Sequence, residues 1–343
     1  MTVPLLTRRG GRSLASWAIL ALTGVQLALP RGAAAQSAWV PVAGEGSVGL
    51  VFQNLEFDGH FDGGGSHLEG VAGSRAHLAI FQFEYGLTDR LAFTARLPYI
   101  ASKFTGTDDE PIMILIRERY EEYRRTHPDI PADSSLDTGN YYATFQDWGF
   151  TLRYNLLNRG VTVTPVVSAT IPSHHYRTIG EAAPGQDRLA LHTGVNVGRL
   201  LDPLLPRAYV HGRYTYSFVQ RFRGIPLDRS SAEFEVGYAI TPIVSVRVLV
   251  NWMKTHGGVG FAEAYEDLTL FLSHDRLLAS RYWHTGAATT VSLTNSIDLE
   301  GAVLLMLAGA DTHSGIGVNV GLTWHFLTPR GRRPSSQVRT TRR

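Results

Sequence analysis

Apolar and polar residues alternate along most of this chain, and a period of two is the pattern of a β-strand whose two faces have different surroundings. The stretch 147–156 is typical, because Trp148, Phe150, Leu152 and Tyr154 share one face while mostly small or polar residues fill the other. The alternation recurs in about twelve segments, each near the roughly 9 to 11 residues with which a tilted strand crosses a bilayer. Beyond the first thirty residues no apolar run reaches the roughly 18 to 20 residues of a membrane-spanning helix, which excludes a helical membrane bundle.

We expect strands at twelve places, joined by connections that alternate in length. The strands lie near residues 47–56, 75–86, 91–100, 141–156, 161–172, 187–199, 207–218, 230–239, 243–253, 281–293, 297–309 and 313–327. The connections 87–90, 157–160, 200–206, 240–242 and 294–296 are short, whereas 57–74, 101–140, 173–186, 219–229 and 254–280 are long and 310–312 is brief.

Alternation alone leaves the outward face undecided, because a barrel with an apolar ligand cavity has the same period as a membrane barrel. Aromatic residues near strand ends and short turns opposite long loops both favour an outer-membrane barrel. Strands in hydrocarbon must also close into a ring, since an open edge leaves backbone groups without partners. We therefore predict an all-β fold: a closed antiparallel transmembrane β-barrel of about 12 strands with short periplasmic turns, long extracellular loops and a narrow passage.

The first 35 residues have the composition of a cleaved secretory signal. Arg8, Arg9 and Arg12 precede an apolar stretch, and Ala33 to Ala35 form an A-x-A site before Gln36. We expect residues 1–35 to direct export by a Sec-type route to the outer membrane of a Gram-negative cell. A single barrel domain should follow over 36–327, and a basic, disordered periplasmic tail over 328–343.

Composition removes several classes of function. The absence of cysteine excludes disulfide scaffolds, thiolate zinc sites and cysteine nucleophiles. The formal net charge of +2 comes from the two ends, because the signal carries four arginines and no acid and the last fourteen residues carry six arginines. The remaining body is net acidic, which gives no support for a nucleic-acid partner.

Short motifs resemble one outer-membrane family. They are EYGLTDRL at 84–91 with LPY at 97–99, DWGFTLRY at 147–154, ATIPS at 169–173 and YAITP at 238–242. Together they resemble the MetA-pathway of phenol degradation family of outer-membrane transporters. The chain departs from the family in its long 101–140 loop and in continuing past Phe326. The resemblance implies a channel or transporter for small, aromatic or hydrophobic compounds, without specifying phenol.

The polar face of the strands provides the candidate solute pathway. We expect eight of its residues to face the lumen: Arg96, Asp147, Arg153, His192, Arg213, Glu235, Arg247 and Glu300. Such residues can order water and select solutes in a barrel. The alternative is that arginines and carboxylates neutralise each other, since a lone buried charge is costly.

The loop 101–140 contains a change to helical periodicity over 111–125. Pro111 suits the first turn of a helix, and glutamates and arginines would make an exposed charged face. We consider this segment a gate candidate, with Ile112, Ile114, Arg117 and Tyr120 over the pore. The alternative is a solvated extracellular helix, or one that contacts lipopolysaccharide.

Other functions have weaker support in the sequence. The histidine pairs His174–His175 and His60 with His67 lack the spacing of a metal site, so we expect no metal and no cofactor. A lipid hydrolase using Ser314 or Ser273 beside His313 or His274 stays open, although no G-x-S-x-G motif is present. A non-transporting surface binding or structural barrel is a third reading. The partners we expect are outer-membrane lipids and lipopolysaccharide, the barrel assembly machinery and small-molecule solutes.

Overall fold

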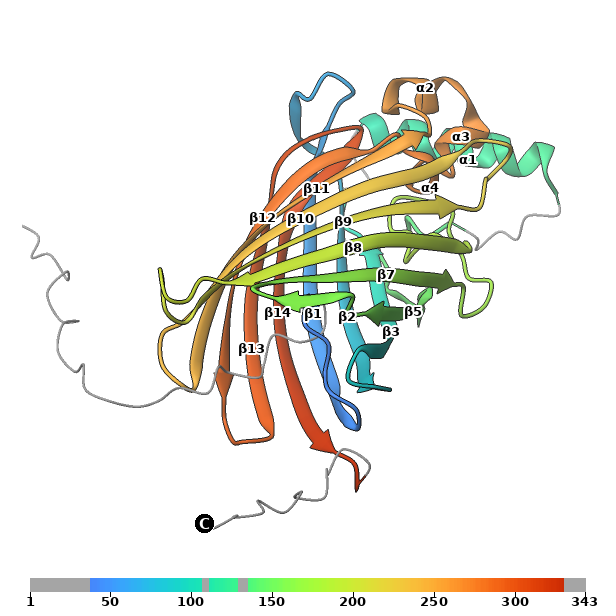
Figure 1. Ribbon diagram of the computed structural model, residues 1–343. Helices are drawn as coiled ribbons and strands as arrows, with labels where there is room; N and C mark the ends of the chain where they lie inside the picture. The colour runs from blue at the N-terminus through green and yellow to red at the C-terminus, as the bar shows by residue number, and fades with distance from the viewer. Residues whose placement is uncertain (1–37, 107–110, 129–134, 330–343) are drawn as a thin grey trace, which may run out of the picture.

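A computed structural model describes residues 38–106, 111–128 and 135–329, and these form a closed antiparallel β-barrel (Figure 1). The expected signal, residues 1–35, and the tail from 330 onward lie outside the described residues. The first described residues and the C-terminal strand end meet at the end of the barrel that carries short turns, which we call the inner end. The opposite end, which carries the long connections, is the outer end.

Fourteen strand segments build the wall. They are β1 (Glu45–Phe61), β2 (His67–Gly86), β3 (Leu91–Phe104), β4 (Tyr142–Phe145), β5 (Trp148–Tyr154), β6 (Leu157–Arg159), β7 (Val161–Ile171), β8 (Ala190–Leu200), β9 (Ala208–Val219), β10 (Leu227–Ala239), β11 (Val244–Gly257), β12 (Arg281–Ser292), β13 (Ile297–Ala310) and β14 (Thr312–Leu327). Both β4 and β5 pair with β3, and both β5 and β6 pair with β7, so these three segments are one interrupted strand. The ring therefore has 12 strands, and pairing of β1 with both β14 and β2 closes it. The predicted fold is confirmed.

The two faces of the wall differ as the alternation predicts. Along β14, Ile316, Val318, Val320 and Leu322 point outward and remain about half exposed in the isolated chain. Polar side chains on the opposite face, such as Asn196 on β8, are almost fully buried inside the barrel. An apolar outer surface of this kind becomes stable when hydrocarbon covers it.

The hairpin of β1 and β2 differs from the expected loop at 57–74. Its strands stay paired beyond a register shift between Phe57 and Gly59, and only 62–66 form the turn. The sequence did not predict the longer hairpin, because Asp58 and Gly59 interrupt the alternation of apolar and polar residues. A β-bulge accommodates such an interruption within a paired strand. The hairpin therefore rises past the rest of the barrel wall at the outer end (Figure 1).

Four helices lie at the outer end: α1 (Pro111–Thr126), α2 (Phe261–Glu266), α3 (Leu268–Phe271) and α4 (His274–Leu277). The helical pattern at 111–125 predicted α1, whereas the three short helices were not predicted. We call residues 258–280, which contain them, the outer cap. Gly258 has a φ of +83°, and a Cβ there would lie 2.6 Å from the carbonyl oxygen of Leu277, so the chain enters the cap through a turn that favours glycine. None of the described helices is long and apolar enough to cross a membrane.

Two apolar clusters hold the outer segments on the barrel. Tyr120 and Tyr123 of α1 pack with Phe104, Ala182 and Phe271. A second cluster joins the cap to strands β8, β9 and β10, and it contains Ala190, Val219, Leu227, Val259, Ala264 and Leu277. The long connections are thus packed against one another and against the rim of the barrel.

Candidate solute pathway

Three cavities follow one another through the interior of the barrel. The outer cavity has a volume of about 470 Å³, the middle one about 440 Å³ and the inner one about 320 Å³. The outer and middle cavities share Arg229 and Tyr282 in their walls, and the middle and inner cavities share Gln82 and Arg96. The barrel therefore holds a chain of adjoining spaces that runs toward both ends.

Apolar side chains predominate in the outer cavity. They include Leu55 and Phe57 of β1, Leu227 of β10, Met253 of β11 and Leu304 of β13. On the neighbouring strands β2 and β3, Leu78, Ile80 and Ile100 form a further apolar cluster, against which Leu55 packs. A solute with an apolar body gains free energy on entering such a space, at roughly 25 cal/mol per Å² of apolar surface buried.

The middle cavity is lined by arginines. Arg96, Arg153, Arg213 and Arg229 come from four different strands, and Glu233 is the acidic residue among its lining side chains. Within the described part of the chain Arg96 has no ion-pair partner, and its side chain is exposed to the lumen. The middle of the passage therefore has a positive field that favours an anion.

Ion pairs fix the charges toward the inner end. Arg247 lies between two carboxylates, with Nη2 2.7 Å from Glu300 and Nε 3.4 Å from Glu235. The hydroxyl of Tyr209 donates a hydrogen bond of 2.6 Å to Glu235. Arg247 offsets one of the two negative charges of Glu235 and Glu300, and Arg153 of the middle cavity is paired with Glu84. The inner cavity therefore keeps an acidic character, whereas Arg96 in the wall of the middle cavity has no such counter-charge among the described residues.

Seven of the eight predicted lumen residues line these cavities. The middle cavity holds Arg96, Arg153, His192 and Arg213, and the inner cavity holds Arg96, Glu235, Arg247 and Glu300. Asp147 is placed differently, because its carboxylate accepts a 2.6 Å hydrogen bond from the hydroxyl of Tyr176. Asp147 lies between β4 and β5, so this hydrogen bond holds the loop that contains Tyr176 against the barrel wall. That these residues form a solute pathway stays a prediction.

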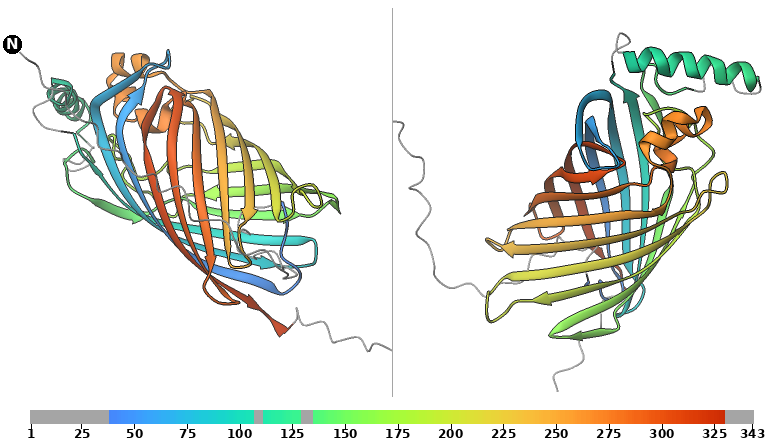
Figure 2. Two further views of the ribbon diagram at one scale, coloured as in Figure 1. Left: turned by 90° about the vertical axis from the view of Figure 1, so that its left-hand side faces the viewer. Right: turned by 90° about the horizontal axis from the view of Figure 1, so that it is seen from above.

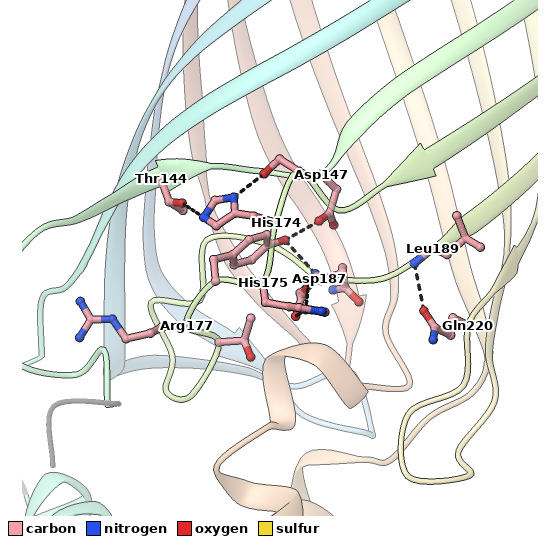
Figure 3. Close-up of polar contacts among 12 residues, drawn as sticks. Thr144, Asp147, His174, His175, Arg177, Asp187, Leu189 and Gln220 are labelled. Atoms are coloured by element: carbon pink, nitrogen blue, oxygen red, sulfur yellow. Dashed lines mark hydrogen bonds and ion pairs between the residues drawn. The ribbon is translucent and has the colours of Figure 1, made fainter. Parts of the chain in front are cut away.

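The connection between β7 and β8, residues 172–189, folds into the mouth of the barrel, and we call it the inward loop (Figure 3). Its Tyr176 bridges Asp147 and the backbone N–H of Asp187, which donates to the tyrosine oxygen at 2.8 Å. Gln186 accepts a hydrogen bond of 3.2 Å from Arg229, and its carbonyl oxygen accepts another from Arg276 of the cap.

The helix α1, which carries the proposed gate residues, lies beside the pore. Viewed from above, α1 lies outside the ring of strands (Figure 2). Tyr120 is buried against the loops, and its oxygen accepts a hydrogen bond from the N–H of Ser135. The side chains of Ile112, Ile114 and Arg117 lie outside the described residues. A gating role for this helix stays a prediction.

A strap at the N-terminus of the described chain, residues 38–44, crosses the inner end. Gly44 is hydrogen-bonded to Gly86 beside β1, while the carbonyl of Ala38 accepts a 2.5 Å hydrogen bond from Thr164 on β7. The ring of Trp39 meets that of Tyr209 edge to face at 5.8 Å. Tyr209 lies on β9, which is opposite β1 in the strand order, so the strap spans the inner opening.

His192 contacts a serine hydroxyl, and among the described residues no acidic side chain orients its ring. His192 uses one ring nitrogen for Ser217 at 2.7 Å and the other for Thr170 at 2.8 Å. A serine nucleophile needs a histidine that is oriented by a third, acidic group. His192 therefore has the contacts of a structural residue in the wall.

Comparison with solved structures gives the same architecture. An outer-membrane channel from Pseudomonas putida F1 superposes with a TM-score of 0.60 at 14% identity, over 84% of this chain and 97% of that one. Two further structures are more distant and carry no argument. The KdgM porin in complex with oligogalacturonate has a TM-score of 0.43 at 7% identity, over 82% of this chain and 99% of that one. The toluene transporter TodX of P. putida has a TM-score of 0.39 at 10% identity, over 85% of this chain and 92% of that one. A scan against protein-family models finds no match, and a search of curated proteins finds none. The chain thus has the fold of the outer-membrane barrels.

Proposed function

We propose that this protein is an outer-membrane channel for the passive passage of small solutes, with no covalent chemistry. The observation that carries the proposal is the succession of three adjoining cavities through a closed barrel. The outward apolar face supports a place in the membrane, and the signal-like residues 1–35 support export. The resemblance to the MetA-pathway of phenol degradation transporters agrees with this function.

The preferred solutes combine an apolar body with an anionic group. The apolar outer cavity would take the body, and the arginines of the middle cavity would attract the charge. Aromatic carboxylates such as benzoate have this chemistry. The inward loop and the strap limit the free cross-section, which favours small molecules over oligosaccharides.

Uptake into proteoliposomes tests both parts of the proposal. The mature protein should admit benzoate faster than acetate or benzylamine, and it should exclude maltotriose. Arg96→Gln should slow benzoate entry about fivefold, because one charge at about 4 Å in water-like surroundings contributes about 1 kcal/mol. In planar bilayers the same variant should shift the reversal potential toward lower anion preference.

Arg177→Gln is the matched control, because this arginine lies over the ring of Tyr142 in the outer loops and lines none of the three cavities. It should behave like the unmodified protein. Folded protein that admits none of the four solutes and carries no current would disprove the channel and favour a binding or structural barrel. Equal uptake of benzoate and benzylamine would disprove the anion preference alone.

A further inference from the structure

A group of metal-binding side chains lies where the outer cap meets the barrel wall. His274 and Asp275 belong to α4 and His313 to the start of strand β14, and one ligand atom of each lies within 4.8 Å of the others. Asp275 Oδ1 is 3.3 Å from Nε2 of His274 and 2.8 Å from Nε2 of His313. Glu181 of the inward loop adds Oε1 at 4.0 Å from His274 Nε2. Three separate parts of the chain therefore converge on one point.

The orientation of His274 is typical of a metal ligand. Its Nδ1 lies 2.5 Å from the carbonyl oxygen of Phe271, which can only accept, so Nδ1 carries the proton and Nε2 the lone pair. The ring is buried, and Nε2 has no hydrogen-bond partner among the described residues. Metal-bound histidines commonly donate their other N–H to a backbone carbonyl in this way. A lone pair that faces two carboxylates is repelled unless a positive charge lies between them.

Negative charge is concentrated around the same point. Asp137 accepts a 2.8 Å hydrogen bond from the backbone N–H of Glu181, and both residues are outside the membrane-spanning strands. A buried cluster of acids is costly unless protons or a cation compensate it.

We propose that His274 Nε2, Asp275 Oδ1, His313 Nε2 and Glu181 bind one divalent transition-metal ion of the Zn²⁺ class. Bonds of about 2.0 to 2.2 Å in a tetrahedral site place neighbouring ligand atoms about 3.3 Å apart, which matches the 3.3 Å between Asp275 Oδ1 and His274 Nε2. The 2.8 Å between Asp275 Oδ1 and His313 Nε2 must lengthen when the ion binds. Two imidazoles favour Zn²⁺ over Ca²⁺ or Mg²⁺, which prefer oxygen ligands. The ion would join the outer cap, β14 and the inward loop, and so fasten the outer mouth of the barrel.

The test uses the mature, tag-free barrel in detergent after removal of metals by a chelator. We expect one Zn²⁺ per chain by calorimetry and elemental analysis, and a visible absorption spectrum of tetrahedral Co²⁺ when Co²⁺ is added instead. His274→Ala, His313→Ala and Asp275→Asn should each weaken Zn²⁺ binding by about 100-fold or more, since loss of an outer-shell partner alone costs about 10- to 100-fold. Zn²⁺ should also protect the cap from proteolysis in the unmodified protein.

His175→Ala is the matched control, because its side chain is 97% exposed in the inward loop and it should leave Zn²⁺ binding unchanged. Asp275→Asn keeps the size of the side chain, and retention of heat-modifiable gel mobility will show that each variant is folded. The proposal is wrong if the folded, unmodified barrel binds no Zn²⁺. It is equally wrong if the three ligand variants retain full affinity, or if His175→Ala loses as much affinity as they do.

Discussion

At the scale of single residues, the pair of Arg153 and Glu84 is the most deeply buried pair of opposite charges described in the lumen. Their side chains are 2% and 4% exposed, and they join β5 and β2 on either side of β3. Arg153→Met alone should lower the free energy of unfolding by about 3 to 5 kcal/mol, because it leaves a buried carboxylate without its counter-charge. Urea unfolding in lipid vesicles, followed by tryptophan fluorescence, measures the difference.

The double variant Arg153→Met with Glu84→Met provides the control, because it removes both charges and should recover most of the lost stability. A double variant as unstable as the single one would show that shape, and not charge, sets the cost.

The sequence predicted on which face of a strand a residue lies, but not which residue it pairs with. The period of two placed Arg153 and Arg247 on the polar face, but which carboxylate each one meets depends on the register between strands. His274 and His313 are a clearer case, since no spacing rule links them. A helix in a loop and the start of a strand become neighbours only when the ring closes.

At the scale of elements, the inward loop depends on Tyr176, whose hydroxyl contacts Asp147 and Asp187. Tyr176→Phe removes the donor to a part-buried carboxylate, and hydrogen bonds to charged groups contribute about 1.5 to 3 kcal/mol. We expect faster hydrogen exchange over 172–189 and larger current fluctuations, with the unfolding of the barrel almost unchanged. Tyr154→Phe, at an outward tyrosine on β5, should change neither measurement.

Elements with a regular period were predicted, and those without one were not. The strands and α1 follow their periodicities, whereas the inward loop is held by individual hydrogen bonds that leave no pattern in the sequence. The three helices of the outer cap have four to six residues each, too few for a period to be visible. Their stability comes from packing against the barrel rim, which local sequence does not encode.

At the scale of the whole molecule, stability depends on the apolar outer surface. Val320 lies in the middle of β14 and is 52% exposed on that surface. Val320→Arg should destabilise the barrel in vesicles by about 2 to 4 kcal/mol, the cost of an arginine at mid-bilayer depth. Leu204→Arg, in an inner turn, should cost about 0 to 1 kcal/mol. Similar values for the two variants would contradict the assigned membrane depth.

The strap imposes an order on biogenesis. Ala38 lies within the ring against Thr164 of β7, whereas β1, which follows the strap, pairs with β14, the last strand. The strap can reach Thr164 and Tyr209 only when β7 and β9 have taken their places opposite β1, so its docking follows the assembly of that half of the ring.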